Sequence, residues 1–386
     1  LIVGAKNLLF VTHYTGIGGG EMVLLNLAQH LDRARYTPHL LVPGDGQVAE
    51  RWRALGGPVH IIPFRGATEY FIPAIWARFP IVGKIEALIR EQRIDALHTD
   101  YHSLPMALPA AERAGIPTMW TCMGWWTRPK PWQYALFRRP TATMALDEAV
   151  RDGYVGQPPF MPPEEITLVF PGVDTSKFHP GVDGTRVRFQ AGIAQDAPVV
   201  ALVARFQQVK GHEVFQAMAR QVALQIPEAR FIVAGENVHG QSADEAYKQR
   251  ILQAAKNDPL LRDRLVYLGF RDDVERVMAA ADVLVCSSQF ESYGMAIVEA
   301  MACAKPVVAT RRGGPSETVV HGETGFLVDP GDAEGLARHV ITLLQNPDLR
   351  ARIGAAGRAR VEARFSAQAQ ARDFMAVADR VIGQRR

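Results

Sequence analysis

The 386-residue chain lacks the features of several protein classes. Its three cysteines, Cys122, Cys286 and Cys303, are too few and too widely spaced for a disulfide framework or a metal-ligand motif. No apolar run approaches the roughly 20 residues that a membrane-spanning helix needs. A net charge of +3 gives no case for nucleic acid binding from composition. We therefore expect buried thiols in a reducing, cytoplasmic compartment.

A glycine loop at Gly18–Gly20 also falls short of the common nucleotide motifs. It lacks the third glycine of a dinucleotide fingerprint, and no Gly-Lys-Ser/Thr of a phosphate-binding loop occurs in the chain. The glycines still permit a close approach of the backbone to a ligand. A plain flexible turn is the alternative interpretation.

Short apolar segments alternate with helix-forming segments along the whole chain. This alternation predicts α/β structure with parallel sheets, and the length exceeds one ordinary core. The linker is expected at 171–180, which holds two prolines and a glycine. We expect two doubly wound domains facing each other across a cleft, over 1–175 and 176–365, with a helix at 366–386 joining the first. The expected strands are 7–11, 39–42, 59–62, 94–98, 118–121, 143–146, 166–170, 199–204, 230–234, 265–267, 283–286, 307–309 and 326–328.

Two carboxylates lie near the start of one predicted helix. Glu291 is in the turn between the buried strand 283–286 and a helix over 295–304, and Glu299 is about one helical turn further in. In a parallel sheet such a turn lies at the carboxyl edge, where ligands bind, and the free N–H groups of the helix start favour a phosphate. The two acids could hold hydroxyl groups of a sugar or ribose. The alternative is a solvated turn carboxylate and a helix-surface glutamate.

Two cations, Arg205 and Lys210, follow the first strand of the second half. Strand ends of adjacent βα units meet at the same edge of a sheet, so these side chains could approach the Glu291 turn. An arginine fork and a lysine point charge suit a diphosphate. The alternative is that they are ordinary loop cations.

Taken together, these motifs resemble the retaining glycosyltransferases of family four, which have two facing Rossmann-like domains (the GT-B fold). The resemblance extends over most of the chain, in several motifs that keep their order. The matching segments are Gly18–Glu21, Gly172–Pro180, Arg205–Gly211, Ala281–Asp282, Phe290–Ala302, Gly313–Glu317 and Gly322–Val328.

The resemblance implies that a sugar is transferred from a nucleoside-diphosphate sugar to a hydroxyl acceptor, with retention of configuration. Arg205 and Lys210 would bind the diphosphate, and Glu291 would hold the donor sugar. The leaving phosphate oxygen would accept the acceptor's proton on the same face, so the protein supplies positioning and electrostatic stabilisation. No Asp-x-Asp occurs, so we expect no metal and no cofactor. The remaining implied donor-site residues are Ser292, Tyr293, Gly294, Met295 and Glu299, while Gly18, Gly19 and Gly20 would border the phosphates and the acceptor.

The first half departs from the family pattern on the acceptor side. Met123 stands where many members carry a histidine. His98, Asp100 and His102 are the other acceptor-side candidates, although a histidine at a strand end is more often structural. Two rival functions therefore stay open: a nucleotide-sugar epimerase of the same fold, and a non-catalytic nucleotide-sugar or glycan-binding protein.

An acid-free stretch between Arg113 and Thr143 contains five cations and four of the six tryptophans. A second aromatic cluster, Tyr70–Trp76, lies in the same half. Tryptophans beside cations suit a membrane interface or a sugar platform. We expect a saccharide or lipid-linked acceptor and peripheral contact with the inner membrane face through this basic stretch. The alternative is that both clusters pack between helices.

Overall fold

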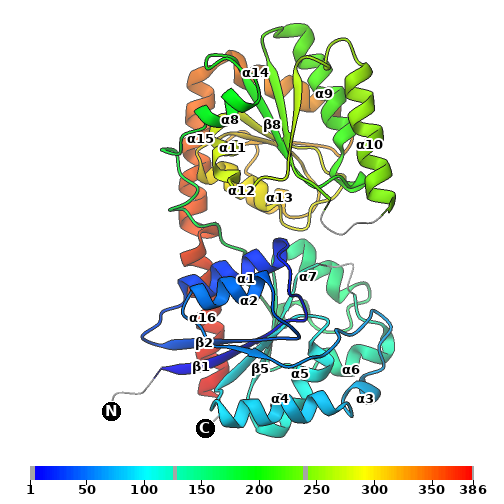
Figure 1. Ribbon diagram of the computed structural model, residues 1–386, viewed down its shortest axis with the longest axis vertical. Helices are drawn as coiled ribbons and strands as arrows, with labels where there is room; N and C mark the ends of the chain where they lie inside the picture. Colours follow the sequence, from blue (N-terminus) through cyan, green and yellow to red (C-terminus); the bar gives the residue numbers. More distant parts are fainter. Residues whose placement is uncertain (1–4, 125–127, 238–241, 385–386) are drawn as a thin grey trace. The chain divides into compact units, whose positions relative to one another are not determined.

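The computed structural model describes residues 5–124, 128–237 and 242–384 and divides the chain into two units (Figure 1). The first unit runs to Gly172 and resumes at Ala367, and the second is Val173–Ser366. Each unit is built on its own parallel sheet flanked by helices. The expectation of two doubly wound, Rossmann-like domains is therefore confirmed. The boundaries expected from sequence are 175 and 365, and those of the structure are Gly172 and Ser366.

The first unit contains a seven-stranded sheet in the order β3-β2-β1-β4-β5-β6-β7. Every neighbouring pair is parallel, and each of these strands overlaps a segment expected from sequence. Their bounds are β1 Lys6–Val11, β2 Tyr36–Val42, β3 Val59–Ile61, β4 Ala96–Thr99, β5 Thr118–Cys122, β6 Ala142–Ala145 and β7 Ile166–Leu168.

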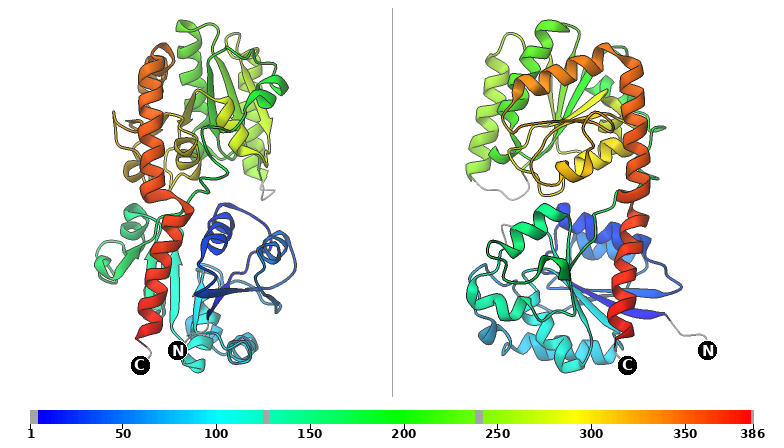
Figure 2. Two further views of the ribbon diagram at one scale, coloured as in Figure 1. Left: turned by 90° about the vertical axis from the view of Figure 1, so that its left-hand side faces the viewer. Right: turned by 180° about the vertical axis from the view of Figure 1, so that it is seen from behind.

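Helices cover both faces of this sheet. Leu8 and Phe10 of β1 pack with residues of α1, α2 and α16 on one face, whereas Leu9 and Val11 pack with α4 and α5 on the other. Successive strand residues point to opposite faces, so a strand covered on both sides must be apolar throughout. The C-terminal helix α16 belongs to this unit and lies against its sheet (Figure 2). The helices are α1 Gly19–His30, α2 Gln47–Ala54, α3 Pro73–Trp76, α4 Pro80–Glu91, α5 Leu104–Ala114, α6 Tyr134–Phe137, α7 Glu148–Val155 and α16 Ala367–Gly383.

The second unit contains a six-stranded sheet in the order β10-β9-β8-β11-β12-β13. Its strands are β8 Val199–Val203, β9 Arg230–Ala234, β10 Leu265–Gly269, β11 Val283–Cys286, β12 Val307–Thr310 and β13 Phe326–Val328. Its helices are α8 Thr185–Gln190, α9 His212–Gln225, α10 Ser242–Asn257, α11 Val274–Ala280, α12 Met295–Ala302, α13 Pro315–Thr318, α14 Ala333–Gln345 and α15 Pro347–Arg360. A large core cluster joins α9, α10 and α14 to one face of the sheet.

Helix ends differ slightly from the sequence-based expectation. The helix expected over 295–304 ends at Ala302, because Ala304 adopts a left-handed φ of 54° that turns the chain toward β12. Helix α15 ends at Arg360 and is followed by a π-helical turn, Val361–Phe365.

Candidate functional site

Three loops of the second unit lie side by side at the carboxyl edge of its sheet. They follow β8, β11 and β12, which are neighbours in the sheet and pair in parallel. Backbone hydrogen bonds tie the loops together: Gln289 N–H donates to Val209 C=O at 2.7 Å, and Glu291 N–H donates to Arg312 C=O at 3.2 Å. The polar side chains of these loops are thus held in one region.

An ion pair between Lys210 and Glu291 forms the centre of this region. Lys210 Nζ lies 2.6 Å from Glu291 Oε2, and the side chains are only 18% and 14% exposed. Ser288 Oγ donates to the same Oε2 at 3.1 Å. Among the described residues no hydrogen bond is made to Oε1, so this oxygen can accept from a ligand hydroxyl. Sequence reasoning missed Ser288, although its position directly after β11 was a usable signal.

Two glycines allow the loops to approach this closely. Gly211 has a φ of 67°, and a Cβ there would lie 2.1 Å from Ser287 O. Gly313 has a φ of 85°, and a Cβ there would lie 2.0 Å from Glu291 O. A side chain at either position would push apart the backbones that bring Lys210 and Glu291 together.

Helix α12 begins directly after this turn, with Gly294 as its N-cap residue. The predicted donor-site residues differ in their exposure to solvent. Tyr293 is buried against Phe365, whereas Ser292 and Met295 are partly exposed. Burial raises the pKa of Glu299 to about 7; nearby Lys177 opposes the shift, and Glu275 adds to it. Glu299 is therefore a carboxyl group near its point of ionisation at neutral pH.

Arg205 lies in the same set of loops but differs from Lys210. Its side chain is exposed, and it makes no ion pair among the residues that the structure describes. Its carbonyl oxygen accepts a 2.9 Å hydrogen bond from the ring of His212, which stacks on Phe206. The backbone at Arg205 is fixed while the guanidinium is available for an anion. His212 is a supporting residue that the sequence analysis did not identify.

The first unit brings a second group of polar side chains to the carboxyl edge of its sheet. Asp100, after β4, accepts hydrogen bonds from Thr12 Oγ1 at 2.8 Å and Ser103 N–H at 2.7 Å. Burial alone would raise the pKa of Asp100, but its contacts with His13, Thr12 and the Ser103 N–H outweigh burial and lower it. His102 bonds through Nδ1 to the carbonyl of Ala67 at 2.7 Å. Asp100 and His102 thus lie in this group together with Thr12 and His13, which sequence reasoning missed.

His98 does not join that group. Its ring lies between Phe10 and Phe374, and its Nε2 is 2.8 Å from Thr121 Oγ1. Burial lowers the pKa of His98 to about 4, so the ring is neutral. These contacts are those of a packed structural histidine.

The Gly18–Gly20 loop opens α1 at the same edge of the first sheet. Glu21 accepts a 2.9 Å hydrogen bond from Gly18 N–H and so closes the start of the helix. A Cβ on Gly20 would lie 3.4 Å from Met123 Cε, so Met123 packs against this loop. The Gly18–Gly20 loop and Met123, which are both predicted to lie on the acceptor side, are therefore in contact.

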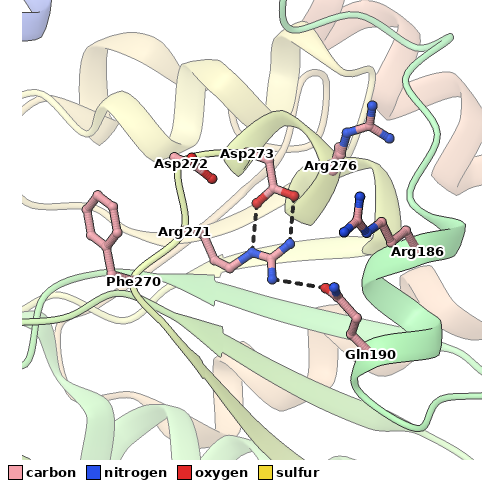
Figure 3. Close-up of a pocket in the computed structure, with 7 residues that line it drawn as sticks. All are labelled: Arg186, Gln190, Phe270, Arg271, Asp272, Asp273 and Arg276. Atoms are coloured by element: carbon pink, nitrogen blue, oxygen red, sulfur yellow. Dashed lines mark hydrogen bonds and ion pairs between the residues drawn. The ribbon is translucent and has the colours of Figure 1, made fainter.

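A separate pocket of about 390 Å³ follows β10, the edge strand of the second sheet (Figure 3). Three arginines, two aspartates, Gln190 and Phe270 line it. Arg271 is held by both oxygens of Asp273, at 2.7 and 2.6 Å, and by Gln190 at 3.0 Å. The pocket contains none of the predicted donor-site residues, so the Lys210–Glu291 region defines the candidate site better.

Metal-ligating side chains do not gather in groups of three or more within the part of the chain that the structure describes. Over the same residues, no helix is both long and apolar enough to cross a membrane.

Two family models match the chain in succession. The model described as Glycosyltransferase Family 4 matches residues 17–177, and the model described as Glycosyl transferases group 1 matches residues 183–360. Together they include the glycine loop of the first unit and the Lys210–Glu291 region of the second.

Two curated relatives are about one-third identical to part of the chain. N-acetyl-alpha-D-glucosaminyl L-malate synthase of Bacillus anthracis is 30% identical over 208 residues, which are 54% of this chain and 51% of the relative. Alpha-maltose-1-phosphate synthase of Mycolicibacterium smegmatis is 33% identical over 236 residues, 58% of this chain and 59% of the relative. The chain thus matches a little over half the length of each.

Solved structures share the whole fold. A glycosyltransferase from Rickettsia africae superposes with a TM-score of 0.84 at 19% identity, covering 98% of this chain and 99% of that one. Anabaena Alr3699/HepE in complex with UDP and glucose has a TM-score of 0.77 at 23% identity, covering 96% and 99%. At this identity the likeness establishes the fold.

Proposed function

Because this chain is a family 4-like glycosyltransferase with the GT-B fold, we propose that it moves a sugar from a nucleoside-diphosphate sugar to a hydroxyl acceptor. The transfer retains the anomeric configuration. The observation that carries the proposal is the Lys210–Glu291 ion pair, formed at the turn before α12. Arg205 follows β8 in the same loop as Lys210, and its side chain is exposed.

The two cations suit the diphosphate. An ammonium has three N–H donors, and Lys210 uses one of them for Glu291, so others remain for phosphate oxygens. Arg205 adds a planar fork that matches phosphate geometry, and the N–H groups at the start of α12 favour negative charge. Glu291 Oε1 accepts a hydrogen bond from a hydroxyl group of the donor sugar. Glu299 accepts hydrogen bonds from the ribose hydroxyl groups.

In the chemical step, the main task of the protein is to stabilise the charge that develops on the leaving group. The bond between the anomeric carbon and the phosphate oxygen breaks, and a bond to the acceptor oxygen forms on the same face. The acceptor proton passes to the leaving phosphate oxygen. Lys210 and Arg205 stabilise the negative charge that develops on the diphosphate, in the place of a metal ion.

Peripheral membrane contact belongs to the same proposal. Trp120 is buried in the core and Trp125 and Trp126 lie outside the described residues, but another part of the first unit is exposed and apolar. Its side chains are 39–66% exposed, and Trp132 is tied to this segment by a 3.2 Å bond to Phe71 C=O. The members are Tyr70, Ile72, Ile75, Phe79 and Trp132.

Cations accompany this patch, defined as those five side chains. Arg78 and Lys84 are exposed, and Lys130 lies 5.0 Å from the ring centre of Tyr70. The nearby acid Glu69 is neutralised by Lys130 at 2.7 Å. Apolar side chains with surrounding cations suit an anionic bilayer surface, where a lipid-linked acceptor would be found.

A thermal-shift screen of UDP, GDP and ADP and their hexose conjugates tests the donor assignment. A ligand that binds only the native state raises the unfolding midpoint, and the stabilisation grows with the logarithm of its concentration above the dissociation constant. UDP comes first, because the Anabaena neighbour binds it. Product analysis without acceptor then separates a transferase from an epimerase, which needs no acceptor, and slow donor hydrolysis would exclude a binding protein.

A further inference from the structure

His13, directly after β1, directs one ring nitrogen at Asp100, directly after β4. Nδ1 lies 3.7 Å from Asp100 Oδ2, and Nδ1 is buried without a hydrogen-bond partner in the described structure. This distance is longer than a hydrogen bond but short enough for the carboxylate charge to act on Nδ1. The imidazole therefore faces the carboxylate with its Nδ1 edge.

Two hydrogen bonds hold the carboxylate of Asp100 in place. Oδ1 accepts from Ser103 N–H at 2.7 Å, and Oδ2 accepts from Thr12 Oγ1 at 2.8 Å. A carboxylate held in this way favours the His13 tautomer that carries its proton on Nδ1, which leaves a lone pair on Nε2.

Neighbouring residues also cover other parts of the His13 ring. A Cβ on Gly66 would lie 2.5 Å from His13 Cδ2, so that edge packs against backbone. The side chain is 21% exposed overall. Only Nδ1 of this ring is a buried nitrogen without a partner, and Nε2 makes no hydrogen bond among the described residues, so Nε2 is the nitrogen open to a ligand.

Two aromatic rings lie against the His13 ring. The Tyr14 ring centre is 3.7 Å from that of His13 and the residue is 41% exposed, while the His102 ring centre is 4.5 Å away. Burial, with Asp100 and Glu21 nearby, raises the pKa of Tyr14 to about 12, so its hydroxyl stays neutral. Ligand sites commonly combine aromatic side chains with a few polar atoms that fix the orientation of the ligand.

We propose that His13, aligned by Asp100, accepts a hydrogen bond at Nε2 from a non-reacting hydroxyl group of a neutral saccharide acceptor, with Tyr14 against the sugar face. This inference rests on the proposed function. The attacking hydroxyl has one proton, which passes to the leaving phosphate oxygen, so the hydroxyl at His13 is a neighbouring one. His13 is a positioning residue that neither forms a covalent bond nor takes a proton.

Imidazole ¹⁵N NMR of the full chain tests this directly, with the methyl glycosides of glucose, galactose and mannose as probes. The His13 signals are identified by their loss in His13→Gln. We expect the Nδ1–H tautomer, a shift of the Nε2 signal with at least one glycoside, and roughly tenfold weaker glycoside binding in His13→Ala. His60→Gln, on edge strand β3, is the matched histidine control and leaves binding unchanged.

Asp100→Asn distinguishes alignment from mere packing. Oδ1 must remain an oxygen to accept from Ser103 N–H, so the new amide nitrogen replaces Oδ2 and directs its N–H groups, rather than a negative oxygen, toward His13 Nδ1. The tautomer reverses, and glycoside binding weakens as in His13→Ala, with no further loss in the double variant. Far-ultraviolet circular dichroism verifies that both near-isosteric variants, His13→Gln and Asp100→Asn, are folded.

Three results would overturn the proposal: no glycoside shifts the His13 signals at tens of millimolar, His13→Ala binds glycosides unchanged, or Asp100→Asn keeps the tautomer. The NMR titration needs no donor, so it remains readable if the nucleotide screen fails. Conversely, UDP stabilisation of His13→Ala that equals the parent's shows that the donor assignment stands whatever the glycosides do.

Discussion

The ammonium of Lys210 lies 2.6 Å from Glu291 Oε2, although 81 positions separate the two residues. The pair joins a cation suited to a diphosphate to a carboxylate suited to sugar hydroxyls. Because both side chains are mostly buried, each fixes the position of the other. The pair therefore sets the geometry of the proposed donor site before any ligand binds.

Replacing Glu291 should remove activity with little loss of fold. Glu291→Gln keeps the shape but loses the charge that holds Lys210, and we expect kcat to fall on the order of 100-fold or more. Steady-state transfer rates and thermal midpoints measure the two effects. Glu334→Gln, at an exposed ion pair, serves as the control, and unchanged turnover in Glu291→Ala would contradict the assignment.

At Gly211, the stability cost of a Cβ that contacts Ser287 should be separable from the cost of a left-handed backbone conformation. Gly211 and Gly192 have the same φ of 67°, but only Gly211 has backbone within contact of a Cβ. Gly192→Ala should cost about 1–2 kcal/mol of unfolding free energy. Gly211→Ala should cost roughly 1–3 kcal/mol more, because Ser287 must move. Urea denaturation tests this, and equal losses would show that the loops do not interlock.

Stability should depend on pH through Glu299. Burial raises its pKa from 4.5 to about 7, so between these values the folded protein keeps a proton that the unfolded chain releases. Its contribution is fully present below pH 4.5 and is lost as the pH rises to 7. Glu299→Gln should flatten this slope in urea titrations at several pH values. A slope identical to that of the parent chain would show that Glu299 is not buried in solution.

Membrane contact should depend on the exposed patch. Ile75→Ser should reduce sedimentation with vesicles of phosphatidylglycerol and phosphatidylcholine at low salt, while Leu224→Ser, exposed in the second unit, should not. Phosphatidylcholine alone should bind less, because the cations Arg78 and Lys84 lose their anionic partners. Absence of sedimentation with the anionic vesicles would refute the contact.

Chelation should leave transfer intact. Lys210 and Arg205 are proposed to stabilise the leaving diphosphate, so EDTA should change kcat by less than about twofold. Transfer assays with EDTA and with added Mg²⁺ measure this. A large loss that Mg²⁺ restores would mean that a metal shares this role.

Much of the fold could be predicted because the local signals were unambiguous. Strands such as β8 and β11 are apolar throughout, as strands covered on both faces must be. Asp332 is a strong N-cap residue type, and its side chain caps the start of α14 by accepting from Gly335 N–H. Lys210 and Glu291 could be linked from sequence, because the ends of adjacent parallel strands meet at one edge.

The tertiary structure alone decided which side chains share an environment. His13 and Asp100 are joined only because the chain places β4 beside β1, and nothing local distinguishes that order from another. His98, two residues from Asp100, instead packs between Phe10 and Phe374. Sequence thus determined the strands, the turns and the motifs of the proposed donor site, whereas strand order and packing determined burial and side-chain partners, because those properties depend on residues far apart in the chain.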